Sequence, residues 1–255
     1  TRLDTFLEKV QESGLDVIGY AKGFDRNGKQ DEMLKVNAGI LAKKADVVIL
    51  CLGLDEIQES EGLDRTTMEL AQNQRELLHF LHNANSNIAV VFHAGSSVTM
   101  PWLGDCEALL YAALCGQAGA GAICDALTGK VNPSGSLVDT YCYDNYSAPA
   151  MWNFTPSTYE GYVEGGDVPA KSKSYMIYQE GIYVGYKYYE TRYEDFVTGS
   201  GNAGDYAYGD IVAYPFGYGL SYTSYDISDM KVNYNAADDT YTVTVKVTNT
   251  GAMAG

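Results

Sequence analysis

Residues 45–64 read ADVVILCLGLDEIQESEGLD, an apolar run that changes at Gly53 into an acidic loop. The apolar part, residues 47–52, has the length and the β-branched content of a strand buried on both faces. The carboxylates that follow it, before Arg65, are those of Asp55, Glu56, Glu59, Glu61 and Asp64. Ligands of open α/β sheets bind beyond the carboxyl ends of the strands, so this loop is a candidate for acid–base chemistry. The alternative is a solvated, mobile turn.

Helical and strand patterns alternate along the first half of the chain. Apolar spacing predicts helices over residues 3–13, 31–44, 74–84 and 117–128. Short apolar runs predict strands over residues 15–20, 46–52 and 87–92, and a further apolar run covers residues 108–114. This alternation indicates βαβ crossovers and a mostly parallel sheet. The uniformly apolar strands at 46–52 and 88–92 are expected to be adjacent and central in an α/β fold, a three-layer α/β/α sandwich.

The composition changes after about residue 138. Residues 143–210 are rich in Tyr, Gly and Ser and show little periodicity, so they are predicted to be largely irregular. Residues 227–233 and 240–249 alternate with a period of two, as half-buried antiparallel strands do. Two strands alone are too few for a stable sandwich. We therefore expect an α/β sandwich domain over residues 1–223 and an incomplete β-sandwich segment over residues 224–255.

Charge and cysteine content restrict the partners and the compartment. The chain has 255 residues and a formal net charge of −16, which disfavours phosphate backbones and anionic lipid, so neither nucleic acid nor membrane is expected as a partner. No apolar run approaches the ~20 residues of a membrane span. Five cysteines occur without a CxxC pair, and Cys51 lies inside the apolar strand. These features predict reduced structural thiols, a cytoplasmic location, and neither a metal site nor a cofactor.

Several segments, in the same order along the chain, resemble the C-terminal half of a glycoside hydrolase family 3 enzyme of the β-glucosidase/β-xylosidase type. Residues 59–65, ESEGLDR, resemble the ExEGxDR loop of that family, and residues 129–137, GKVNPSGSL, resemble its GxxNPSGxL turn. The most specific matches are residues 180–186, EGIYVGY, and residues 214–223, YPFGYGLSYT. Residues 247–251, VTNTG, resemble the start of the fibronectin-type-III-like domain, which would make residues 224–255 a truncated copy of it.

The resemblance implies one domain of a retaining β-glycosidase that hydrolyses terminal β-linked sugars. Such enzymes need two carboxyl groups roughly 5 Å apart. The nucleophilic aspartate would belong to a (β/α)8 barrel, for which about 250 further residues would be needed. The implied partners are this barrel and a β-linked oligosaccharide or glycoside. The chain alone is expected to be inactive.

The acid/base would be a glutamate of the acidic loop. Glu61 is the first choice because it fills the EG position of the motif, and Glu59 is the second choice. Asp64 and Arg65 are expected to bind substrate or to orient the loop, either as an ion pair or with Asp64 at a helix start. A general acid must keep its proton near neutral pH, which requires burial or a neighbouring carboxylate. On the chain alone we expect Glu61 to be open to water.

Two other functions remain open. The same fold could serve as a non-catalytic carbohydrate-binding or scaffold module, which would differ from the enzyme only at Glu61; Gly62 and Arg65 beside it favour the enzyme. A flavodoxin-like or nucleotide-binding domain is disfavoured, because no strand is followed by GxGxxG or a phosphate loop. The segment at 116–121, GQAGAG, lacks the acidic residue expected downstream.

Overall fold

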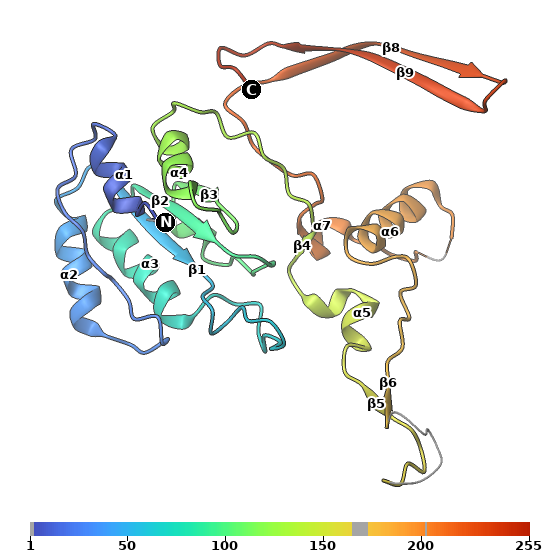
Figure 1. Cartoon of the computed structure of the whole chain (residues 1–255), viewed down its shortest axis with the longest axis horizontal. Coiled ribbons are helices and arrows are strands. Elements are labelled where there is room, and N and C mark those ends of the chain that lie inside the picture. The colour runs from blue at the N-terminus through green and yellow to red at the C-terminus, as the bar shows by residue number, and fades with distance from the viewer. Residues whose placement is uncertain (1–2, 165–172, 202) are drawn as a thin grey trace. The chain divides into compact units, whose positions relative to one another are not determined.

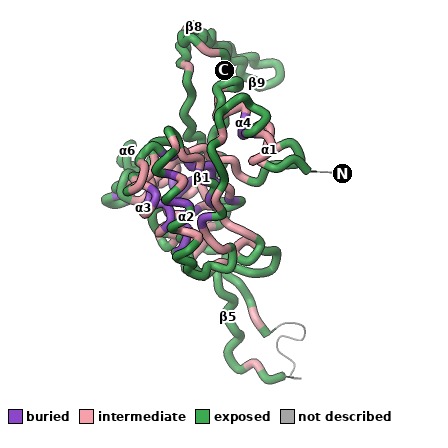
Figure 2. The backbone as a smooth tube through the Cα atoms, turned by 90° about the vertical axis from the view of Figure 1, so that its left-hand side faces the viewer, coloured by how far each residue is buried: buried purple, intermediate pink, exposed green. Residues whose placement is uncertain are grey.

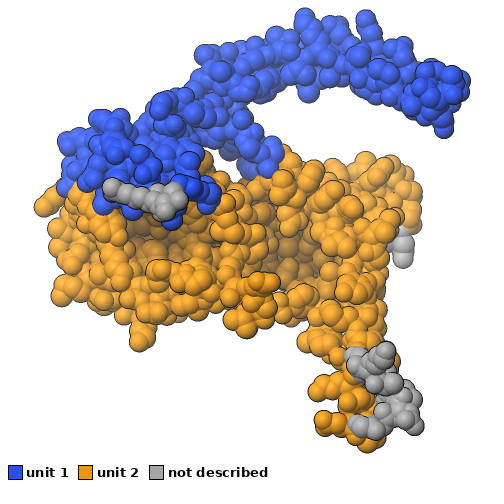
Figure 3. All heavy atoms as spheres, in the orientation of Figure 1, with its two compact units in different colours: residues 1–18, 115–136, 218–255 blue, residues 19–114, 137–217 orange. Residues whose placement is uncertain are grey.

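The computed structural model describes residues 3–164, 173–201 and 203–255, which form two compact units (Figure 3). The first, called here the sheet unit, consists of residues 19–114 and 137–217. The second, the hairpin unit, consists of residues 1–18, 115–136 and 218–255. Among the described residues, no helix has both the length and the apolar character needed to cross a membrane.

A parallel three-stranded sheet lies in the first part of the sheet unit, residues 19–114 (Figure 1). Its strands are β1 (Val48–Gly53), β2 (Ile88–His93) and β3 (Ala108–Tyr111), in the order β1-β2-β3. The register pairs Leu50 with Val90 and Val91 with Leu110. The predicted α/β fold with a parallel sheet is confirmed.

Two helices supply the core on one face of this sheet. They are α2 (Glu32–Ala42) and α3 (Gln72–Ala84), and the buried residues gather along them and along β1 (Figure 2). The cluster joins side chains of both helices and of β1 and β2, including Ala38, Ala42, Leu50, Leu52, Leu77, Leu78, Leu81, Ile88, Val90 and Phe92. The spacing of the three leucines of α3 puts them on one helical face, so burying that face stabilises both the helix and the sheet.

The predicted adjacency of the two apolar strands is confirmed, but the central position holds only for β2. Within the described residues β1 is the first strand of the sheet, with β2 as its only neighbour. The strand predicted over residues 15–20 does not form. Its side chains Leu15, Ile18 and Tyr20 are exposed, so no buried face sets a register for pairing. Cys51 of β1 is exposed as well, contrary to its predicted burial.

A second part of the sheet unit begins at residue 137. Most of its described residues over 143–210 are irregular, as predicted, but the prediction missed its longest helix. This helix, α6 (Tyr186–Thr198), has 13 residues and ends at Gly199 in a left-handed conformation. Only Tyr189 of α6 is buried, so the helix has too narrow an apolar stripe to be seen in the sequence. The other described α-helices and strands here are β4 (Tyr141–Cys142), α5 (Pro149–Trp152), β5 (Ser157–Thr158), β6 (Ser174–Tyr175), α7 (Tyr208–Ile211) and β7 (Val212–Tyr214).

The described residues of the hairpin unit form two helices and one hairpin. The helices are α1 (Phe6–Glu12) and α4 (Gly119–Leu127), and the Cys124 thiol donates to the Lys9 carbonyl at 3.4 Å. The strands β8 (Tyr225–Asn235) and β9 (Thr240–Asn249) pair in antiparallel fashion, as predicted. Every residue of β9 is exposed. The boundary at residue 223 and the fibronectin-like character of residues 224–255 stay predictions.

Candidate functional site

The acidic loop leaves β1 from a fixed point. Gly53 donates its backbone N–H to Oε1 of Gln74 at 2.9 Å, and Nε2 of Gln74 donates to the Gly53 carbonyl at 2.8 Å. Gln74 lies on α3 and is buried. A β-carbon on Gly53 would lie 2.1 Å from the His93 carbonyl oxygen, so only glycine fits there. The direction in which the chain enters the loop is therefore set by the sheet and by α3.

The first half of the loop is a turn organised by Asp55. Its Oδ1 accepts the backbone N–H groups of Ile57 and Gln58 at 3.0 and 3.2 Å. Arg26 forms an ion pair with Glu56 and lies 3.8 Å from Asp55 Oδ2. Exposed ion pairs contribute little stability, so the backbone bonds to Asp55 determine the shape of this turn.

Glu61 lies at the tip of a second turn. The Leu63 N–H donates to the Ser60 carbonyl at 3.1 Å, and Gly62 has a φ of +78°, as the third residue of a type II turn requires. Glu61 is the residue before it and is exposed, as expected for the chain alone. Among the residues that the structure describes, its carboxylate has no hydrogen bond and no ion pair. It is thus the carboxylate of this turn that is left open to a ligand.

Glu59 is bound inside the site instead. Its Oε2 accepts the backbone N–H of Gly95 at 2.8 Å, and its Oε1 accepts the hydroxyl of Ser96. Both partners belong to the loop that follows β2. Glu59 and Glu61 are only two residues apart, but of their two carboxylates only that of Glu59 accepts hydrogen bonds from the described residues.

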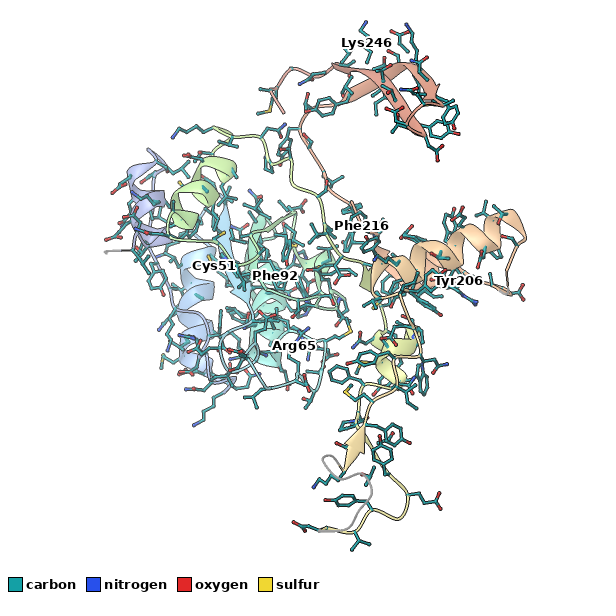
Figure 4. The ribbon with its side chains drawn as sticks, turned by 45° about the vertical axis from the view of Figure 1, so that its right-hand side comes forward. Cys51, Arg65, Phe92, Tyr206, Phe216 and Lys246 are labelled. Carbon is teal, nitrogen blue, oxygen red and sulfur yellow. The ribbon has the colours of Figure 1, made fainter. Side chains whose placement is uncertain are left out.

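Arg65 is bound to the same loop as Glu59. Its Nη2 donates to the Ser97 carbonyl at 2.6 Å, while its Nη1 is buried and has no hydrogen-bond partner among the described residues. Figure 4 shows Arg65 among the loops beyond the sheet that carries Phe92.

The two predicted arrangements of Asp64 are both wrong. Within the described parts of the chain no ion pair joins Asp64 to Arg65, because the guanidinium group turns toward Ser97. Nor does Asp64 begin a helix, since α3 starts only at Gln72. Asp64 is exposed.

Two tyrosines, Tyr111 and Tyr141, lie close to the start of the loop that follows β2. Tyr111 donates its hydroxyl to the Ala94 carbonyl at 2.8 Å, and its ring meets the ring of Tyr141 edge-on at 6.1 Å. Burial raises the pKa of Tyr141 far above that of a free phenol, and hydrogen bonding to Tyr111 and the negative charges of Asp139 and Glu59 raise it further. Tyr141 therefore stays a neutral phenol at any physiological pH.

The described residues contain no candidate metal-binding cluster. No group of three or more His, Cys, Asp or Glu side chains that could hold a metal ion occurs within residues 3–164, 173–201 and 203–255. What the arrangement can do is donate or accept a proton at Glu61.

Sequence reasoning missed the partners of Glu59 and the role of Gln74. The signal was present in part, because the carboxyl ends of neighbouring parallel strands meet at one edge of a sheet. That rule places residues 94–97, after β2, beside residues 54–65, after β1. Nothing in the sequence indicates which side chain bonds to which backbone group.

Known proteins resemble this chain over most of its length. A family model described as the glycosyl hydrolase family 3 C-terminal domain matches residues 3–186. Thermostable beta-glucosidase B of Acetivibrio thermocellus is 36% identical over 260 residues, which cover 100% of this chain and 30% of that protein. An exo-alpha-(1->6)-L-arabinopyranosidase of Bifidobacterium longum is 36% identical and matches 98% of this chain and 29% of its own length.

Solved structures give the same picture. The GH3 beta-glucosidase of Bifidobacterium adolescentis aligns with a TM-score of 0.78 at 36% identity, covering 98% of this chain and 33% of that one. The beta-glucosidase of Kluyveromyces marxianus, solved in complex with glucose, aligns with a TM-score of 0.65 at 35% identity, covering 88% of this chain and 23% of that one. The chain thus spans about a third or less of the length of these relatives.

Proposed function

The chain belongs to glycosyl hydrolase family 3, in which it corresponds to the C-terminal domain, and we propose that it supplies the acid/base glutamate of a retaining β-glycosidase. The proposed substrate is a terminal β-linked sugar. The proposed acid/base is Glu61, and the nucleophilic aspartate belongs to a (β/α)8 barrel that lies outside this chain.

The observation that supports Glu61 is the contrast between the two glutamates of the loop. A general acid must reach the glycosidic oxygen within hydrogen-bond distance. Glu61 stands at the tip of a turn and has no partner among the described residues, so its carboxyl group is available. Both oxygens of Glu59 already accept hydrogen bonds from Gly95 and Ser96. A substrate would have to displace these donors before Glu59 could act.

In the proposed reaction Glu61 acts twice. It first donates a proton to the glycosidic oxygen while the bond from the sugar to that oxygen breaks and the barrel aspartate bonds to the sugar. As a carboxylate it then accepts a proton from the water that hydrolyses the glycosyl-enzyme. The exposure of Glu61 means that the barrel has to enclose it, since acid catalysis in open water is weak. Because the chain carries only one of the two carboxyl groups, it should not hydrolyse glycosides alone.

The two neighbouring residues have supporting roles in this proposal. Arg65 orients the loop through its bond to the Ser97 carbonyl. Asp64, exposed and next to the turn, can accept hydrogen bonds from sugar hydroxyl groups.

The names of the relatives guide the choice of test sugars. They include β-glucosidases and exo-alpha-(1->6)-L-arabinopyranosidases. We propose a β-glucoside as the first substrate, with an α-L-arabinopyranoside as the comparison.

The experiment replaces Glu61 by alanine in the complete enzyme that contains this chain. Turnover of aryl glycosides with poor leaving groups should fall ~10²–10⁴-fold, the usual contribution of general acid–base catalysis. Dinitrophenyl glycosides, whose leaving group needs no proton, should lose far less, and added azide should raise their rate by replacing the missing base.

Glu56→Ala is the matched control, because Glu56 is an exposed acid of the same loop. It should show neither the dependence on the leaving group nor the rescue by azide. If Glu61→Ala and Glu59→Ala both behave like Glu56→Ala, the alternative of a non-catalytic binding or scaffold module is correct.

A further inference from the structure

We infer that Glu59 is a positioning residue, which fixes the turn that carries Glu61 by binding the loop after β2. This inference rests on the proposed function of Glu61 and assigns to Glu59 a task that is separate from proton transfer.

The first support is the way in which both oxygens of Glu59 are used. Oε2 accepts from the Gly95 N–H at 2.8 Å and Oε1 accepts from the Ser96 hydroxyl. The approach is close: a β-carbon on Gly95 would lie 3.3 and 3.4 Å from the two carboxylate oxygens, and 2.9 Å from a methyl group of Leu114. Glycine at position 95 is thus part of the contact, because a larger residue would push the carboxylate away.

The second support comes from the other end of the turn. Arg65 bonds to the Ser97 carbonyl at 2.6 Å. The turn formed by residues 60–63 is therefore held on both sides, by Glu59 before it and by Arg65 after it. The partners are three consecutive residues, 95–97, of one loop.

The loop at 95–97 is itself a firm support. Ala94 before it and Val98 after it are 0% and 2% exposed. Ala94 also accepts the hydroxyl of Tyr111 from the neighbouring strand β3. Side chains that bond to this loop are therefore held in position relative to the core of the sheet unit.

Holding the turn matters because proton transfer depends on distance. A displacement of about 1 Å in a reacting group can lower a rate by ~10²-fold. Glu59 needs no negative charge for this task. A glutamine at position 59 can accept the Gly95 N–H with its amide oxygen and donate its amide N–H to the Ser96 oxygen. An alanine can do neither.

The test therefore compares Glu59→Gln with Glu59→Ala in the complete enzyme. With a poor leaving group, Glu59→Ala should lower kcat by about 10–100-fold while KM changes little, since the acid is misplaced and not removed. Glu59→Gln should keep kcat within about threefold of the parent enzyme. Azide should rescue neither variant, because the carboxyl group of Glu61 is still present. Glu61→Gln, by contrast, should lose activity as Glu61→Ala does.

A second measurement checks the contact without any activity. In this chain, hydrogen exchange of the Gly95 amide should be at least about tenfold faster in Glu59→Ala than in the parent or in Glu59→Gln, because the amide loses its acceptor. An unchanged exchange rate in Glu59→Ala would overturn the inference.

Loss of activity in Glu59→Gln together with azide rescue of Glu59→Ala would also overturn it, and would make Glu59 the acid/base. If instead the Gly95 amide responds as expected but Glu61→Ala shows no dependence on the leaving group, it is the proposed function of Glu61 that fails. The two failures are thus distinguishable.

Discussion

Replacing Gln74 by methionine should destabilise the sheet unit, because it removes both hydrogen bonds that hold Gly53. Methionine has nearly the volume of glutamine and is unbranched, so it can fill the same space without leaving a cavity. It offers no donor or acceptor for the Gly53 N–H and carbonyl, which are bonded to Gln74 at 2.9 and 2.8 Å. The substitution therefore isolates the hydrogen bonds from the packing.

The size of the effect follows from the two groups left without partners. A buried donor or acceptor that loses its partner costs about 1–3 kcal/mol. Gln74 is only 6% exposed, while Gly53 is partly buried, so values toward the lower end of that range apply. Two such groups give an expected loss of about 2–4 kcal/mol in the free energy of unfolding. This is a large part of the ~5–15 kcal/mol that stabilises a typical domain.

Urea unfolding followed by tryptophan fluorescence measures this loss. The chain has two tryptophans, and Trp152→Phe in the background leaves Trp102 as the single reporter. Trp102 is 5% exposed and lies 5.7 Å from the ring of Phe92, so its emission reports on the core next to β2.

Gln72→Met is the matched control. Gln72 lies on the same helix and is exposed, and its side chain donates to the carboxylate of Glu76 at 2.7 Å. Its replacement should change the free energy of unfolding by less than about 0.5 kcal/mol. If Gln74→Met costs no more than Gln72→Met, the bonds between Gln74 and Gly53 do not hold the exit of β1, and the reasoning is refuted.

Three further changes test other parts of the chain. Burial raises the pKa of Tyr206 to about 12. A free tyrosine titrates at about pH 10. Between about pH 10 and pH 12 the unfolded chain therefore loses a proton that the folded chain keeps. Stability should then fall as the pH rises above about 10, and Tyr206→Phe should make this fall shallower in urea titrations at pH 9–12; an unchanged slope would contradict it. Gly62→Ala forces a side chain into a φ of +78° at a strain of ~1 kcal/mol, so kcat of the complete enzyme for poor leaving groups should fall about fivefold. Gly62→Asn should lose less, and equal losses would argue against backbone strain. Asp31→Ala removes the acceptor for the Met33 and Leu34 N–H groups at the start of α2 and should cost ~1 kcal/mol in urea unfolding, whereas Asp31→Asn should cost little. An asparagine variant as unstable as the alanine variant would point away from capping.

The strands β1 and β2 could be predicted because each is a run of consecutive apolar residues. Val90, Val91 and Phe92 are all 0% exposed, so β2 is buried on both faces, as its composition indicates. The segment at 15–20 has a similar apolar content but no buried side, and whether such a segment pairs depends on neighbours that its own sequence does not specify. Helix α6 could not be predicted because it has no continuous apolar face. It packs through tyrosines, of which only Tyr189 is buried.

The candidate site shows the same division. The turn at Glu61 and Gly62 and the acidic character of the loop are local properties, and both follow from the residues themselves. The bonds of Glu59 to Gly95 and of Arg65 to Ser97 join residues more than thirty positions apart. Such bonds depend on the register of the two neighbouring strands β1 and β2, which the sequence does not specify. The same holds for Arg65, whose expected partner was next to it in sequence but whose actual partner belongs to the adjacent loop.

The hairpin of β8 and β9 affects how any melting curve of this protein must be interpreted. Side chains such as Ile227, Val243 and Val247 are 69%, 59% and 58% exposed, so almost no burial accompanies the formation of this ladder. Its hydrogen bonds can then open locally, at a free energy well below that of the sheet unit. Circular dichroism in the β region will sense the ladder, while Trp102 senses the core, and the two probes should give transitions that do not coincide. A single free energy of unfolding therefore describes the sheet unit and not the whole chain.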